Sequence, residues 1–203
     1  QGWLVYELTG SAFALGWVGA GWSLATLALG LYGGALADRV DRRATIFWMR
    51  LGMMVWTLIV GVLVKTGAIQ VWHLALGSFL NGAFSAFLMP AQQAIISDLV
   101  KPQTLMNAVS LDAVGMGLMG MVGASVAGWF IDALGAQAVY FLMAGLYVFS
   151  LFTVTRLPHT APPTPVSRSV GADLADGMRY VRTQPLLLLL LMLELVRVVV
   201  AMP

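Results

Sequence analysis

The chain has 203 residues, of which 60% are hydrophobic and only 10% are charged, and its mean hydropathy is +0.87. Soluble domains usually carry about 25% charged residues, so a soluble domain is excluded and hydrocarbon is expected to surround most of the chain. The net charge of +2 and the absence of cysteine exclude a strongly basic nucleic-acid-binding surface, disulfides and thiolate metal sites.

Apolar segments of helical length dominate the sequence. A transmembrane helix needs about 20 mostly apolar residues, and no alternating pattern of a membrane β-barrel is present. Complete candidate helices lie at about 11–37, 44–64, 71–96, 105–131 and 136–156, with the end of one helix at 1–8 and the start of another at 186–203. The sequence therefore predicts an all-α membrane bundle.

The composition changes after residue 157. Four prolines between 158 and 165 predict a stiff linker, and charged residues at helical spacing in 173–182 predict an amphipathic surface helix. The expected domains are a transmembrane bundle at 1–157, a linker with the surface helix at 158–184, and the start of a second bundle at 185–203. Because the chain starts without methionine and stops after an apolar run, we expect it to be truncated at both ends.

The positions of the basic residues predict the orientation. If the helices alternate in direction, one side carries eight basic residues and the other carries Lys65 alone, a strong positive-inside bias. The eight are Arg39, Arg42, Arg43, Lys101, Arg156, Arg168, Arg179 and Arg182. Residues 38–43 and 157–184 are therefore expected to be cytoplasmic, in a multi-pass protein of the bacterial inner membrane.

A weak internal repeat also supports this architecture. A Gly-x-x-x-Asp pattern ends the second helix at Gly34–Asp38 and the fifth at Gly128–Asp132. These are equivalent positions in two successive triplets of helices, and the triplets have opposite orientation because three is odd. Inverted triplets of this kind occur in secondary transporters.

One loop carries the most specific motif. Residues 34–43 read Gly-Ala-Leu-Ala-Asp-Arg-Val-Asp-Arg-Arg, which resembles the loop between helices two and three of the major facilitator superfamily, G-x-L-A-D-R-x-G-R-R/K, with Asp41 in place of the second glycine. The segments 2–11, 72–74, 90–94, 107–108 and 177–182 are similar to the branch that exports enterobactin and macrolides. The resemblance implies the six-helix N-terminal half of a twelve-helix transporter.

The sequence departs from that branch in two helices. Leu88 and Gln92 stand where the branch often has Asp and Arg in helix four, and helix five lacks its usual Arg and Gly-Pro pair. The glycines of helix five still predict close helix packing, because small residues let membrane helices approach each other. The packing positions are Gly117, Gly120, Gly123 and Gly128.

Charged residues inside apolar segments are the candidates for a proton or substrate site, because each costs about 2.5–3.5 kcal/mol to insert. Asp112 is either a protonatable coupling group or a structural residue facing a cytoplasmic vestibule. Arg50 either pairs with Asp112 or extends toward the loop. Glu194 and Arg197 are three residues apart on one helical face, so they either join this site or only neutralise each other.

Asp38 is predicted to be part of a conformational latch. It ends a helix, where the macrodipole makes a carboxylate unfavourable, and it contributes little to the positive-inside rule. Asp41 is expected instead to cap the third helix. The latch set is Gly34, Asp38, Arg39, Arg42 and Arg43, although Arg42 and Arg43 are explained equally well by topology alone.

The leading functional hypothesis is a secondary transporter that exports small amphipathic molecules in exchange for protons. Export and the substrate class, which is drug-, macrolide- or siderophore-like, come from the resemblance. The alternatives are a lysophospholipid flippase, a nutrient importer, or a sensor or scaffold that no longer transports. No catalytic motif or metal-ligand spacing indicates an enzyme or a cofactor. The expected partners are a small-molecule substrate, membrane lipid and the missing C-terminal half, with no nucleic acid.

Overall fold

The computed structural model describes residues 2–37, 40–157, 179, 183–184 and 192–193. The chain divides into two compact units, residues 1–164 and 165–203. The expected linker, surface helix and partial seventh helix fall almost entirely outside the described residues, so those domain boundaries remain predictions.

The described part of the first unit consists of helices joined by short turns, which confirms the all-α fold. Five of its helices are long and apolar enough to cross a membrane. The helices are α1 (Gly2–Thr9), α2 (Ala12–Ala37), α3 (Arg42–Lys65), α4 (Val71–Leu99), α5 (Leu105–Leu134) and α6 (Ala136–Thr155), with a short 3-10 turn at Pro102–Thr104.

Helix ends differ from the expected ones by a few residues. Helix α3 begins at Arg42 rather than near 44, because the Asp41 carboxylate accepts a hydrogen bond from the backbone N–H of Arg43 at 2.9 Å, which confirms Asp41 as its cap. Helices α4 and α5 run about three residues beyond their apolar segments. Hydropathy marks the length that hydrocarbon covers, whereas the backbone hydrogen bonds continue until a turn interrupts them.

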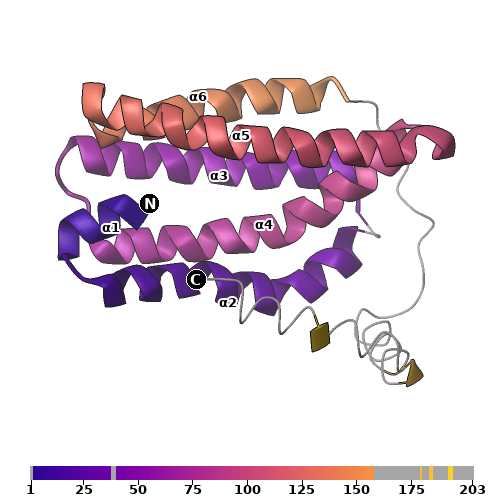
Figure 1. The fold of residues 1–203 in the computed structure, drawn as a ribbon, viewed down its shortest axis with the longest axis horizontal. Coiled ribbons are helices and arrows are strands. Elements are labelled where there is room, and N and C mark those ends of the chain that lie inside the picture. Colours follow the sequence, from indigo (N-terminus) through magenta and orange to yellow (C-terminus); the bar gives the residue numbers. More distant parts are fainter. Residues whose placement is uncertain (1, 38–39, 158–178, 180–182, 185–191, 194–203) are drawn as a thin grey trace. The chain divides into compact units, whose positions relative to one another are not determined.

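The helices pack in a definite order. Helix α2 packs on α4, α4 packs on α3, α3 packs on α6, and α6 packs on α5 (Figure 1). Two apolar clusters fill the contacts, one near the start of α4 and one near its end. The first contains Leu4, Val5, Val18, Val60, Leu74 and Tyr140, and the second contains Ile46, Met53, Leu88, Ala91, Ile95 and Val154.

The closest helix contact joins α2 to α4. Pro90 lies inside α4 and has no N–H, so the carbonyl oxygen of Ala86, four residues earlier, lacks its usual helical partner. Gly33 of α2 lies directly on this carbonyl, and any Cβ at residue 33 would overlap the oxygen. A Cβ at Gly82 would likewise lie 2.5 Å from the carbonyl oxygen of Trp22. Glycine is therefore required at both positions for α2 and α4 to approach this closely.

Helix α5 makes fewer contacts than its neighbours. None of its residues is buried among the described part of the chain. A Cβ at Gly117, Gly120, Gly123 or Gly128 would meet nothing within 4 Å. The structure does not place another described helix against this glycine stripe, so its role in packing remains a prediction.

Candidate functional site

The first turn of α3 is tied to the end of α4. The Arg42 guanidinium pairs with the Asp98 carboxylate at 2.5 Å and donates a hydrogen bond to the backbone carbonyl of Ala94 at 3.2 Å. The two charged side chains are 17% and 31% exposed. The C-terminal end of a helix carries partial negative charge, so the Arg42 cation offsets both that charge and the carboxylate of Asp98.

Arg43 makes the equivalent contact with α6. Its guanidinium donates a hydrogen bond to the backbone carbonyl of Thr155, the last residue of α6, at 2.7 Å. Two neighbouring arginines at the start of α3 thus join this helix to the C-terminal ends of two other helices, α4 and α6. Within the described residues, both of these contacts lie inside the same helical unit.

The remaining members of the latch set are placed only in part. Asp38 and Arg39 lie outside the described residues. Gly34 is partly exposed, and a Cβ there would meet nothing within 4 Å. Asp98 was not predicted to be a partner of the motif, although, like Asp38, it is a carboxylate at a helix C-terminus.

We expect the Arg42–Asp98 pair to contribute measurably to stability. In a double-mutant cycle with Arg42→Gln and Asp98→Asn, the coupling energy should be about 1 kcal/mol, the upper range for a partly exposed pair. Thermal and denaturant unfolding of the purified protein would measure it. Lys101→Gln, an exposed cation of the following turn, is the control and should show no coupling to Asp98→Asn. A coupling energy near zero for Arg42 and Asp98 would contradict a structural role for the pair.

Arg50 and Asp112 line the same cleft, although they come from different helices. The cleft has a volume of about 210 Å³ and lies between α3, α4, α5 and α6. The two side chains do not form an ion pair, since no described residue is bound to either charge by an ion pair or hydrogen bond. Its other lining residues are Ile46, Gln92, Ile95, Ile96, Thr153, Val154 and Leu157. The structure thus brings together the two charges that the sequence singled out, while Glu194 and Arg197 lie outside the described residues.

A second cavity, of about 360 Å³, shares Arg50 and Gln92 with this cleft. It also contains Ser150, whose hydroxyl oxygen is buried without a hydrogen-bond partner, and Tyr147, whose hydroxyl lies 3.6 Å from the sulfur of Met53. Sequence reasoning missed Ser150 and Tyr147. Neither residue is charged, and the same helix carries other hydroxyl groups, such as those of Thr153 and Thr155, so the sequence does not distinguish them.

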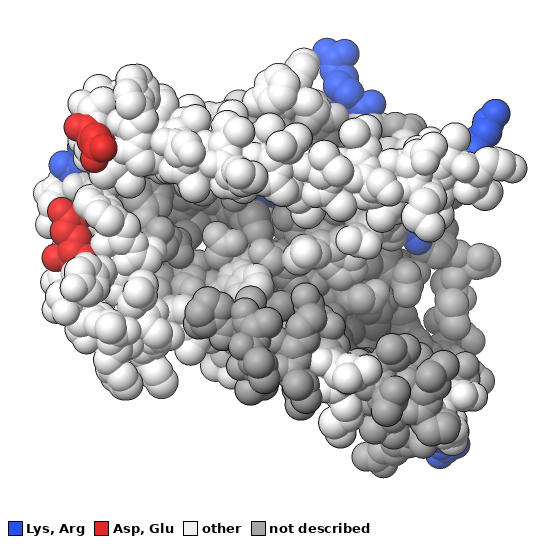
Figure 2. All heavy atoms as spheres, viewed as in Figure 1, with Lys and Arg blue, Asp and Glu red and all other residues white. Residues whose placement is uncertain are grey.

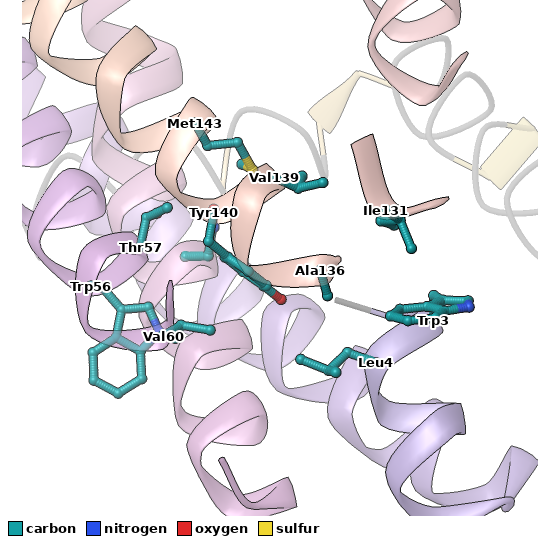
Figure 3. A pocket seen from close by; sticks show the side chains of 11 residues that line it. Trp3, Leu4, Trp56, Thr57, Val60, Ile131, Ala136, Val139, Tyr140 and Met143 are labelled. Carbon is teal, nitrogen blue, oxygen red and sulfur yellow. The ribbon is translucent and has the colours of Figure 1, made fainter. Parts of the chain in front are cut away.

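A third cavity, of about 320 Å³, lies at the opposite end of the helices and is rich in aromatic side chains (Figure 3). Trp3, Trp56 and Tyr140 surround it, and Thr57 and Asn81 add polar groups. The indole N–H of Trp56 is buried without a partner. Tryptophans near helix ends are commonly interfacial anchors. A single sequence does not show which tryptophans of different helices line the same cavity.

Charged side chains lie mainly near the helix ends. On the face shown in Figure 2, acidic side chains lie at one end beside a basic one, while Asp41 and Asp98 lie with Arg42 and Arg43 at the other end of the helices. Among the described residues, no group of three His, Asp or Glu side chains could hold a metal ion. His73 has a local role, since its Nδ1 accepts a hydrogen bond from the backbone N–H of Gln70 at the start of α4.

Comparison with known proteins assigns the chain to a family. A family model described as the Major Facilitator Superfamily matches residues 1–202. Two uncharacterised MFS-type transporters of Bacillus subtilis (strain 168) are similar in sequence. YfiS is 24% identical over 90% of this chain and 44% of its own length, and YceJ is 23% identical over 73% of this chain and 38% of its own length. The chain therefore spans less than half the length of each of these relatives.

Proposed function

Because the chain belongs to the Major Facilitator Superfamily, we propose that it forms part of a secondary active transporter that exports small amphipathic molecules across the bacterial inner membrane in exchange for protons. The observation that carries this proposal is the cleft that holds Arg50 and Asp112 between apolar helices. Charges in apolar spans are costly and typically mark substrate, ion or proton pathways. The aromatic cavity lies toward the other end of the helices. Alternating access requires a binding site that is reached from each side of the membrane in turn, and the two cavities are the proposed positions for it.

The orientation of the helices rests on the distribution of charge. At the end where α3 begins and α4 and α6 finish, the described basic residues are Arg42, Arg43, Lys101 and Arg156, whereas Lys65 is the described basic residue at the other end. This bias supports placing the start of α3 in the cytoplasm. The Arg50–Asp112 cleft then opens toward the cytoplasmic half and the aromatic cavity toward the outer half.

Asp112 is the proposed proton-binding group. In the proposed transport cycle, Asp112 binds a proton in one conformation and releases it in the other. Differential proton affinity between two conformations is what couples protonation to a conformational equilibrium.

We expect Asp38→Asn to slow the conformational cycle without weakening substrate binding. Arg42 and Arg43 are already engaged with α4 and α6, so Asp38 and Arg39 are the motif residues proposed to contact the other half of the transporter. Transport by the purified protein should fall about tenfold, the effect of losing roughly 1.4 kcal/mol of coupling, and accessibility should shift toward the inward-open state. Asp41→Asn is the control, since asparagine also caps helices. If the Asp38→Asn variant transports at the normal rate, the motif has no role in the conformational cycle and only sets the orientation of the helices.

Transport and conformational change are tested together. Expression in a strain without its major efflux pumps should lower the accumulation of amphipathic compounds, and a protonophore should reverse the effect. The 203 residues contain no cysteine, so cysteines can be introduced one at a time at Val139 in the aromatic cavity and at Thr153 in the inner cleft. A transporter should show opposite changes in labelling at these positions as the substrate is added. Unchanged accumulation of every compound, with fixed labelling at both positions, would favour a scaffold or sensor.

A further inference from the structure

The second cavity, of about 360 Å³, lies next to the Arg50–Asp112 cleft and contains polar groups that the described residues leave without partners. Arg50 makes no ion pair or hydrogen bond with a described residue, and the Ser150 hydroxyl is buried and unpaired. The Gln92 side chain lines the same cavity. Arg50 and Gln92 are half-buried, and the Ser150 hydroxyl oxygen is fully buried. Because buried polar groups in proteins are almost always paired, the unpaired Ser150 hydroxyl, next to the Arg50 and Gln92 side chains, indicates a place where a ligand supplies the partner.

The three groups share one chemistry, because each can donate hydrogen bonds. A guanidinium offers a planar set of N–H donors, a serine hydroxyl offers one O–H, and an amide offers two N–H groups. This set matches a carboxylate or phosphate oxygen, and arginine binds both in a bidentate manner. The one acidic residue of the neighbouring cleft, Asp112, does not line this cavity.

The rest of the cavity wall is mostly apolar. It is formed by Met53, Leu88, Met143 and Leu146, together with Tyr147, whose hydroxyl lies against the sulfur of Met53. A cavity with a cationic, donor-rich end and an aliphatic wall fits a ligand with one negative oxygen-bearing group and an apolar body. Its volume lies at the lower end of the roughly 300–1,000 Å³ range of small-molecule sites. It therefore suits a ligand with an aliphatic tail of moderate length, or one end of a larger ligand.

We propose that this cavity binds the carboxylate or phosphate group of an amphipathic anion, with Arg50, Gln92 and Ser150 as the recognising residues. The proposal rests on the transport function and names the substrate class for the cavity that shares Arg50 and Gln92 with the Arg50–Asp112 cleft. It predicts that the transporter selects anionic over cationic amphiphiles, and that the selection depends on the Arg50 guanidinium.

Binding of three ten-carbon probes tests the proposal without requiring transport. Decanoate, decyl phosphate and decyltrimethylammonium would be titrated against the full-length protein in nanodiscs of uncharged lipid, with empty nanodiscs as the reference for partitioning. The natural protein should bind both anions at least tenfold more tightly than the cation. Comparison of decanoate with decyl phosphate distinguishes a fatty-acid-like ligand from a phospholipid-like one.

Variants assign the selectivity to the cavity. Arg50→Gln should weaken anion binding by about 10- to 100-fold, because hydrogen bonds to charged groups are the strong ones, and should leave the affinity for the cation unchanged. Ser150→Ala should weaken anion binding by a few-fold. Arg156→Gln is the matched charge control, since Arg156 is exposed and lies 4.9 Å above the Phe152 ring. Ser125→Ala is the hydroxyl control on an exposed face of α5. Both controls should bind all three probes normally.

Two results would overturn the proposal. One is equal affinity of the natural protein for the three probes, and the other is undiminished anion binding by Arg50→Gln. Arg50→Lys keeps the charge but loses the planar donor set, so its affinity for the anions should lie between those of the natural protein and Arg50→Gln. An equal loss of affinity for all three probes in both variants would indicate a structural role for Arg50. Transport of neutral compounds without anion binding would refute this inference alone, and anion binding without any transport would refute the proposed function alone.

Discussion

We expect Asp112→Asn to abolish transport driven by a pH gradient, reducing it to the rate of protein-free liposomes. Asparagine has nearly the same shape as aspartate but cannot bind or release a proton near neutral pH. The Asp112 side chain is exposed on α5 and has no described hydrogen-bond or ion-pair partner, so the substitution should leave folding and membrane insertion intact. Proteoliposomes with an imposed pH gradient would measure the loss, and thermal unfolding would verify the fold.

The control for this prediction lies on the same helix. Asp132→Asn removes an exposed carboxylate near the opposite end of α5 and should transport normally. Substrate exchange without net proton movement should also continue in Asp112→Asn, because exchange does not require the carboxylate to change its protonation state. Retention of pH-driven transport at the natural rate in Asp112→Asn would remove this residue from the coupling mechanism.

We expect Gly33→Ala to have the largest effect on stability among substitutions of one small residue by another. The added methyl group would overlap the carbonyl oxygen of Ala86, a backbone atom that cannot move without shifting α4. Overpacking of this kind typically costs about 1–3 kcal/mol. The melting temperature of the purified protein should fall by several degrees, and expression in the membrane should decrease.

Gly30 gives a matched comparison one turn earlier in α2. A Cβ at Gly30 would meet nothing within 4 Å, and alanine favours helices over glycine by about 1 kcal/mol in water, so Gly30→Ala should be neutral or slightly stabilising. Gly82→Ala, which places a methyl group 2.5 Å from the carbonyl oxygen of Trp22, should resemble Gly33→Ala. Equal melting temperatures for Gly30→Ala and Gly33→Ala would show that α2 and α4 separate at little cost.

The sequence predicted the helices because membrane spans depend on composition, and apolar length is visible without knowledge of contacts. The cap at Asp41 was also predictable, since N-caps are local and involve side chains with a strong preference. The contacts of Arg42 and Arg43 with Ala94 and Thr155 were not predictable. Their acceptors are backbone carbonyls 52 and 112 residues away, and every residue of the chain has such a carbonyl.

The candidate site was predicted only through its charges. Arg50 and Asp112 stand out because charged residues are rare in apolar segments, and the structure places them around one cleft. Ser150 does not stand out, since serines in membrane helices commonly bond to their own backbone. The glycines were also ambiguous from sequence. The stripe in α5 is denser, yet the close contact occurs at Gly33, opposite the Ala86 carbonyl that Pro90 leaves without its helical partner.

The hydrogen bond from Arg43 to the end of α6 has a consequence for the order of assembly. Its acceptor is made 112 residues after its donor, and at a synthesis rate of roughly 5–20 residues per second Arg43 waits about 6–22 seconds for Thr155. In the orientation proposed above, the charge of Arg43 favours a cytoplasmic start of α3 during that interval. The same guanidinium afterwards joins the first helical triplet to the second, so a defect in α6 would also remove a contact made at the start of α3.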